Sequence, residues 1–366
     1  MSEQNREQNK AKIGKRPNKI LRLLIFICVL VVIGLLIWRS IFFKSAEEQL
    51  ADIQAKRSIP DSENAAILYN KLFADYNESD IKPDFLSSAM EKTTISKPWQ
   101  SKDYPELAEW LEDRQNIINS LLDLSKFEKC SFPIPDLFGR IAGDTILSPA
   151  DSPKMDFLGF IKQCSFLLAK SANNDISEGR LEDALEKSLS LIQMGKHFKD
   201  QPEETYFLIG IASESIGSRC IRYIIFNNDV SETQLQKIET AFEMPGSFEK
   251  ETEEIYAIER LRERASSPDR SLYERFMIWR NLKMPAKREL KEVYVRFSTD
   301  YRANSVFIAL RRYKNKTGQW PESLNEIKQL APSEAFIDSA TGKQLKYEKQ
   351  GQDFSLSGEA IKIWPR

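Results

Sequence analysis

The fold is decided by one long stretch, residues 157–226, which reads FLGFIKQCSFLLAKSANNDISEGRLEDALEKSLSLIQMGKHFKDQPEETYFLIGIASESIGSRCIRYIIF. Apolar residues recur through it at helical spacing and predict three helices, at residues 157–173, 178–198 and 206–226. The links between these helices are short, so consecutive helices should pack antiparallel. We therefore expect a helical core at the centre of the chain.

The composition of the 366-residue chain supports this expectation. Only 14 residues are glycine, which is few for a β-sandwich, and 41% are hydrophobic, which is enough to bury a sizeable core. One histidine excludes zinc sites that need two or three imidazoles, and four cysteines are too few for a disulfide scaffold. The sequence holds no phosphate-loop, dinucleotide, EF-hand, zinc-protease or nucleophile-elbow motif. We expect no cofactor and no metal, and we assign no catalytic residue.

Shorter helices are predicted on the N-terminal side of this core. Residues 45–57 form one, and a second follows Pro60 with Asp61 or Ser62 as its cap. A single helix is predicted from Pro105 to Leu122. Residues 130–152 are rich in proline and glycine and predict an irregular segment.

The turn inside the core has a sequence that is typical of a known repeat. Residues 179–185 (GRLEDAL) resemble the turn and second helix of a tetratricopeptide repeat, in which the glycine permits the turn and the alanine lets two helices approach. Asp175 stands where that family usually has an aromatic residue, and no second copy occurs at a 34-residue offset. An ordinary helical hairpin is the preferred interpretation.

An uncharged run of 16 residues, 23–38, lies near the N-terminus. At about 1.5 Å per residue it covers roughly 24 Å of a roughly 30 Å hydrocarbon core, and residues 20–21 and 41–43 extend it. The pattern predicts a transmembrane helix over residues 20–43. Lipid-facing contacts are assigned to Leu23, Phe26, Val29, Val32, Leu35 and Trp38. A buried soluble helix and a cleaved signal peptide are the alternatives, and the one nearby cleavage candidate, Lys44-Ser45-Ala46, fits poorly.

The basic residues are placed asymmetrically about this run. Residues 1–38 carry seven Lys/Arg and two Glu, whereas the rest of the chain carries 46 basic and 52 acidic side chains. The positive-inside rule then predicts a cytoplasmic N-terminus and an extracytoplasmic body. We expect a single-pass protein of the bacterial inner membrane, whose residues 1–19 form a disordered basic tail.

A second basic region lies within the exported part. Residues 255–316 hold 16 Lys/Arg and seven Asp/Glu, with arginines interleaved among aromatic residues. The candidate anionic-contact face comprises Arg260, Arg262, Arg264, Arg275 and Arg280. Two interpretations stay open: pairing with the acidic remainder of the chain, or contact with anionic headgroups or an acidic partner. Nucleic acid is not expected outside the membrane.

The C-terminal residues predict a small α+β unit. A helix over residues 306–316 ends at Gly318, and a further helix should follow Pro321 with Leu324, Ile327 and Leu330 on one face. Alternating residues 345–347 and 354–356 predict a β-hairpin, and residues 361–363 add a third strand.

The order of these pieces is similar to the C-terminal part of type II secretion pseudopilins. The motifs that carry the resemblance are Ala309-Leu310-Arg311-Arg312-Tyr313, then Gly318, Trp320, Pro321 and Ser323-Leu324, then residues 338–347 before the hairpin. Ser339 replaces the usual proline, and residues 19–22 lack the family's processing site. The resemblance implies a membrane-anchored protein with an α+β module, and gives little support for assembly into a fibre.

Few residues remain for chemistry. His197 lies near a predicted helix end, where a positive charge is favourable. Glu249, Glu251, Glu253 and Glu254 can supply paired carboxylates, although a solvated helix start explains them better. Cys130, Cys164 and Cys220 allow either one disulfide or buried free thiols.

The expected organisation is mainly α, with the tail, the anchor, a helical exported domain over residues 45–285, and residues 286–366 as a long helix plus the α+β module. The expected function is non-enzymatic binding or organisation in the cell envelope, through the bilayer and a protein partner. An accessory of a pseudopilin-type secretion or assembly system is one alternative, and a carboxylate-dependent envelope hydrolase is another.

Overall fold

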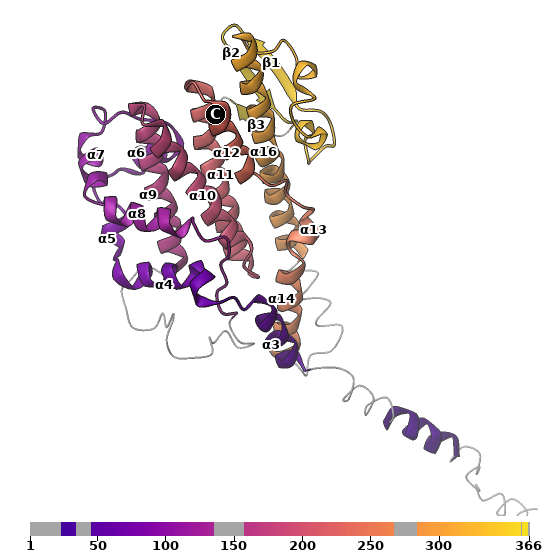
Figure 1. The fold of residues 1–366 in the computed structure, drawn as a ribbon. Helices are drawn as coiled ribbons and strands as arrows, with labels where there is room; N and C mark the ends of the chain where they lie inside the picture. The colour runs from indigo at the N-terminus through magenta and orange to yellow at the C-terminus, as the bar shows by residue number, and fades with distance from the viewer. Residues whose placement is uncertain (1–22, 34–44, 135–156, 267–283, 360, 365–366) are drawn as a thin grey trace, which may run out of the picture. The chain divides into compact units, whose positions relative to one another are not determined.

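The computed structural model describes residues 23–33, 45–134, 157–266, 284–359 and 361–364. The chain divides into two compact units, residues 1–53 and residues 54–366, which are described separately (Figure 1).

In the first unit, residues 23–33 are helical and their large apolar side chains are exposed, from 45% at Ile33 to 60% at Phe26. Helix α3 (Ala46–Arg57) begins where the sequence predicted a short helix. Of the residues described, none belongs to a helix long and apolar enough to cross a membrane. Residues 20–22 and 34–43 of the expected anchor lie outside the described ranges, so the anchor remains a prediction.

The second unit opens with short helices around one hydrophobic core. They are η1 (Asp61–Glu63), α4 (Ala65–Asp75), α5 (Glu78–Ile81), α6 (Ser88–Ser96), α7 (Pro105–Glu112) and α8 (Gln115–Leu124). The predicted caps Asp61 and Ser62 are wrong: Asn64 caps α4, and its side chain accepts from the Ala66 amide at 3.1 Å. The single helix predicted from Pro105 is also wrong, because the backbone leaves helical geometry at Arg114 and so separates α7 from α8.

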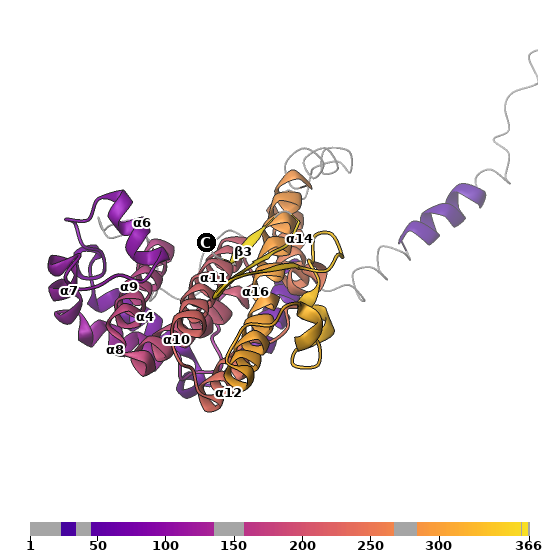
Figure 2. The same cartoon turned by 90° about the horizontal axis from the view of Figure 1, so that it is seen from above.

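The three predicted core helices are confirmed as α9 (Phe157–Glu178), α10 (Leu181–Lys199) and α11 (Glu204–Asn227). Helix α10 is buried on two sides. Leu185 and Ile192 belong to a core shared with α11 and the C-terminal elements, whereas Leu191 and Met194 belong to the core of α4–α9. The core helices therefore join two hydrophobic cores into one body (Figures 1 and 2).

Helices α10 and α11 approach closely through glycines. A Cβ atom at Gly195 would lie 2.7 Å from the backbone nitrogen of Glu214, and one at Gly210 would lie 2.6 Å from the carbonyl oxygen of Gly195. These distances are shorter than ordinary van der Waals contact, so only glycine fits at this crossing.

The next elements are α12 (Glu232–Ala241), α13 (Phe248–Glu251), α14 (Glu253–Ser266) and the 34-residue α16 (Met284–Thr317). Helix α16 packs against α11. Arg222 of α11 is 1% exposed and donates to Asp300 and Asn304 of α16, both at 2.8 Å. The predicted helix over residues 306–316 is thus the end of a much longer one.

The C-terminal residues form a three-stranded antiparallel sheet in the order β1 (Lys346–Gln350), β2 (Asp353–Ser357) and β3 (Lys362–Trp364). Tyr347 pairs with Leu356, and Gly351 takes a φ of 66° in the hairpin turn. The hairpin and third strand are confirmed. The α-helix predicted after Pro321 is wrong. The chain forms two short 3-10 helices instead, η3 (Leu324–Ile327) and η4 (Ser333–Phe336).

The sheet is tied to α16 by one buried carboxylate. Asp338 is 1% exposed, and it accepts from the Thr299 hydroxyl at 3.1 Å and from the amides of Ala340 at 2.9 Å and Glu359 at 2.8 Å. The expected class, mainly helical with a small C-terminal sheet, is confirmed.

Candidate functional site

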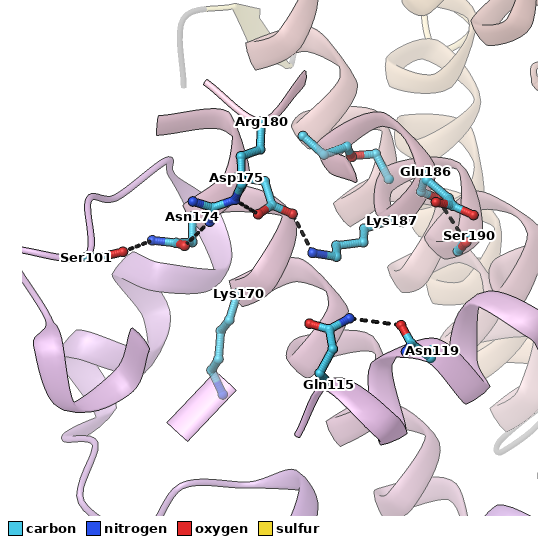
Figure 3. A network of polar contacts seen from close by, with 12 residues as sticks. Ser101, Gln115, Asn119, Lys170, Asn174, Asp175, Arg180, Glu186, Lys187 and Ser190 are labelled. Atoms are coloured by element: carbon cyan, nitrogen blue, oxygen red, sulfur yellow. Dashed lines mark hydrogen bonds and ion pairs between the residues drawn. The ribbon is translucent and has the colours of Figure 1, made fainter. Parts of the chain in front are cut away.

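A cavity of about 490 Å³ lies beside the turn that joins α9 to α10. Helices α7 and α8 form one wall, and the end of α9 and the start of α10 form the other. Its lining residues are Ser101, Ala108, Leu111, Glu112, Gln115, Asn119, Leu122, Ser171, Asn174, Asp175, Arg180, Asp183, Glu186 and Lys187. We call it the Asp175 cavity, after the carboxylate at the centre of its polar wall (Figure 3).

The turn sets the geometry of this wall. Gly179 takes a φ of 76°, in the region that favours glycine, and the Arg180 amide donates to the carbonyl of Asp175 at 2.9 Å. The chain therefore reverses within two residues, and the last turns of α9 lie against the first turns of α10.

Asp175 holds two cations. Its Oδ1 accepts from Arg180 Nε at 2.7 Å, and its Oδ2 accepts from Lys187 Nζ at 2.5 Å (Figure 3). The side chains of Asp175 and Lys187 are only 4% and 8% exposed, whereas that of Arg180 is 46% exposed. Since a buried charge is costly unless it is paired, the Asp175–Lys187 pair fixes the register of α9 against α10.

Asn174 extends the network to the loop before α7. Its Oδ1 accepts from Arg180 Nη2 at 2.6 Å, and its Nδ2 donates to the Ser101 hydroxyl at 3.1 Å. The Ser101 amide in turn donates to Glu178 at 2.7 Å. These bonds tie the end of α9 and the start of α10 to the loop that precedes α7.

Several exposed side chains of the cavity lining have oxygen atoms that pair with no described residue. Glu112, Asp183 and Glu186 are exposed, and no described residue forms an ion pair with any of them. Gln115 donates its Nε2 to Asn119 Oδ1 at 2.9 Å, which leaves its own carbonyl oxygen available. Chemically, the cavity combines a wall in which one carboxylate holds two cations with an acidic opening.

The sequence singled out none of these residues as a site. In the sequence, Asp175 is distinguished only by its departure from the tetratricopeptide pattern. The sequence does contain a signal for this site. The charged residues Lys170, Asp175 and Lys187 lie within helices that are otherwise largely buried and apolar. Charged residues inside buried helices require partners, and such partners are often structural or functional.

His197 is placed differently from the sequence interpretation. It is 2% exposed, its Nδ1 lies 3.1 Å from the Tyr69 hydroxyl and its Nε2 lies 2.9 Å from the Phe127 carbonyl. Burial lowers the pKa of His197 to about 4. The helix-dipole explanation is therefore wrong, because the imidazole is neutral and serves to join α4, α10 and the segment after α8.

Three carboxylates of the acidic run after Gly246 have separate partners. Glu249 pairs with Lys291 at 2.6 Å, Glu251 accepts from the Gly246 amide at 3.0 Å, and Glu254 pairs with Arg57 at 2.6 Å. Another carboxylate, Glu214, is fully buried beside Lys199, and burial raises its pKa. With no exposed surface, Glu214 cannot reach a substrate.

The cysteines in the described part of the chain are free. Cys130, Cys164 and Cys220 are buried, and burial raises the pKa of each thiol. The buried-thiol alternative describes them, and they offer no activated nucleophile.

The basic stretch is only partly described. Arg275 and Arg280 lie outside the described residues, whereas Arg260, Arg262 and Arg264 belong to α14. In α16, Arg312 pairs with Glu232 at 2.7 Å and with Glu239 at 2.9 Å, both from α12. This part of the stretch is thus paired internally, and the anionic-contact face remains a prediction.

Within the described ranges, no three His, Cys, Asp or Glu side chains gather closely enough to hold a metal ion. Comparison of the chain with protein families, curated proteins and solved structures finds no match.

Proposed function

We propose that the protein is a membrane-anchored, non-enzymatic binding or organising protein of the bacterial cell envelope, and that its partner enters the Asp175 cavity. The anchoring is supported by the basic tail and the uncharged run, and by the exposed apolar side chains of residues 23–33. The binding role is supported by the cavity, whose volume lies in the range of small-ligand sites.

The observation that carries the proposal is the Asp175 ion-pair network. Both carboxylate oxygens of Asp175 are engaged by cations, and Lys187 is engaged in turn by Asp175. Because its charged groups already hold one another, this wall keeps its shape and is suited to recognition rather than to catalysis.

Site-specific photo-crosslinking in native membranes tests this role. A benzophenone amino acid in place of Asn119, at the cavity, should give a saturable adduct, and the same group in place of the exposed Lys343 in the C-terminal module should not. The substitution Ala108→Trp fills the cavity from α7 and should abolish the adduct at position 119. Circular dichroism of the full chain in micelles verifies that this variant keeps its helices.

The proposal is wrong if the adduct at position 119 is absent, or if it persists unchanged when the cavity is filled. An adduct of equal strength at both positions would also contradict it, because it would show contact without a site.

An accessory role in a pseudopilin-type system is the second candidate. It is favoured by the order of elements in the C-terminal module, where the long α16 leads through 3-10 turns to a three-stranded sheet. In that case the crosslink at position 343, rather than the one at position 119, should capture a pilin-like partner. A hydrolase is less well supported, because Glu214 is enclosed and the carboxylates after Gly246 are separately paired.

A further inference from the structure

The Asp175 cavity has a charge pattern that identifies a ligand class. Its lining carries four carboxylates, Glu112, Asp175, Asp183 and Glu186, against the two cations Arg180 and Lys187. Four carboxylates against two cations leave the lining with a net charge of −2. Both cations are bound to Asp175, so the carboxylates without a cation partner are the three exposed ones.

A second observation lies deeper in the cavity. Ser171 of α9 is 6% exposed and lines the cavity, and no described residue bonds its hydroxyl. The hydroxyl of this largely buried residue is therefore open to the cavity and available to a ligand. Together with the free carbonyl oxygen of Gln115, it adds neutral acceptors to the charged ones.

The spacing of the carboxylates argues against a metal ion. They do not converge closely enough, among the residues described, to ligate one cation. The α7 and α8 wall also contributes an apolar patch, formed by Ala108, Leu111 and Leu122. Dispersed negative charge around an apolar patch suits an extended organic cation, whose methylenes are buried while its charged ends reach carboxylates.

We propose that the Asp175 cavity binds an alkylammonium group, with its methylene chain against Ala108, Leu111 and Leu122 and its ammonium donors on the carboxylates at the mouth and on Ser171. The inference rests on the proposed binding function and specifies its ligand chemistry. The group can come from a free diamine or from a lysine side chain of a partner protein, because both offer the same chain and head.

Calorimetric titration of the full chain in detergent micelles at low salt tests the proposal. The probes are 1,5-diaminopentane, Nα-acetyl-lysine methylamide and glutarate, which has the same number of carbons as the diamine and the opposite charge. We expect saturable binding of the diamine that weakens as salt rises, and none of glutarate. Binding of both amines indicates a lysine side chain as the natural source, and binding of the diamine alone indicates a free diamine.

Variants locate the bound amine. Glu112→Gln combined with Glu186→Gln should weaken binding about tenfold, and Ser171→Ala should weaken it about threefold. The matched double substitution Glu289→Gln with Glu348→Gln removes the same charge from exposed positions on α16 and β1, and should leave the affinity within about twofold.

Three outcomes overturn the inference. If neither amine binds, or if the control variant weakens binding as much as the cavity variant, the cavity is not an alkylammonium site. If glutarate binds and the amines do not, the ligand class is wrong, while the binding function stands. The crosslinking at position 119 decides the binding function separately, so the two failures are distinguishable.

Discussion

Replacing Asp175 with Asn should destabilise the protein far more than the loss of one surface charge. The substitution leaves Lys187 buried, with a side chain that is 8% exposed and has no remaining carboxylate partner. Breaking a buried ion pair by removing one partner costs about 3–5 kcal/mol. The contact of Asp175 with the half-exposed Arg180 adds only about 0–1 kcal/mol.

The reverse substitution should be milder. Lys187→Met leaves Asp175 with Arg180 at 2.7 Å, so we expect a loss of about 1–3 kcal/mol. The double variant removes both buried charges, and should cost about 2 kcal/mol less than the sum of the single variants. The exposed pair Lys343–Glu359, with side chains 72% and 49% exposed, is the control and should show a coupling below about 1 kcal/mol.

Urea denaturation of the full chain in micelles, followed by circular dichroism, measures these differences. If the losses of unfolding free energy caused by Asp175→Asn and by Lys187→Met add to within about 0.5 kcal/mol in the double variant, the two side chains do not depend on each other. That result would refute a stabilising Asp175–Lys187 pair.

Three further predictions concern the interior of the second unit. The folded-state pKa of His197, about 4, lies below its unfolded value of about 6.5. The free energy of unfolding should therefore fall by up to about 3 kcal/mol as pH drops through this interval. The plot of unfolding free energy against pH should be flatter for His197→Gln, and an identical plot would contradict the buried neutral imidazole. Gly210→Ala should cost about 1–3 kcal/mol by forcing α11 away from α10, whereas Leu208→Ala on the exposed side of α11 should change the melting temperature little. In a Cys28→Ser background, the three buried thiols should react with a thiol reagent only after denaturation, and fast labelling of the folded protein would contradict their burial.

The helical core was predictable because its signal is periodic and local. Helices α9, α10 and α11 each carry apolar residues at regular spacing, and the hairpin at Gly351 carries alternating residues around a glycine turn. The helix ends were less predictable. Asn64 takes the cap of α4 instead of Asp61 because its backbone also bridges to Lys129, a contact that the local sequence does not reveal.

The site was not predictable from local sequence patterns. Its walls come from α7, α8, α9 and α10, and the packing of these helices brings together residues as distant as Ser101 and Lys187. Local rules describe capping and periodicity, whereas the pairing of Asp175 with Lys187 depends on how two helices meet across a turn. His197 shows the same limit, because its neutrality follows from burial against Tyr69 and not from its place in the helix.

We propose that the body of the chain lies outside the cytoplasm, anchored by residues 20–43, and that the Asp175 cavity meets its partner there. Fusion of a reporter after Arg366 tests this orientation. We expect that an alkaline phosphatase, which is active only outside the cytoplasm, is active in this fusion, and that a reporter active only in the cytoplasm is silent. An inactive phosphatase together with an active cytoplasmic reporter would contradict the orientation.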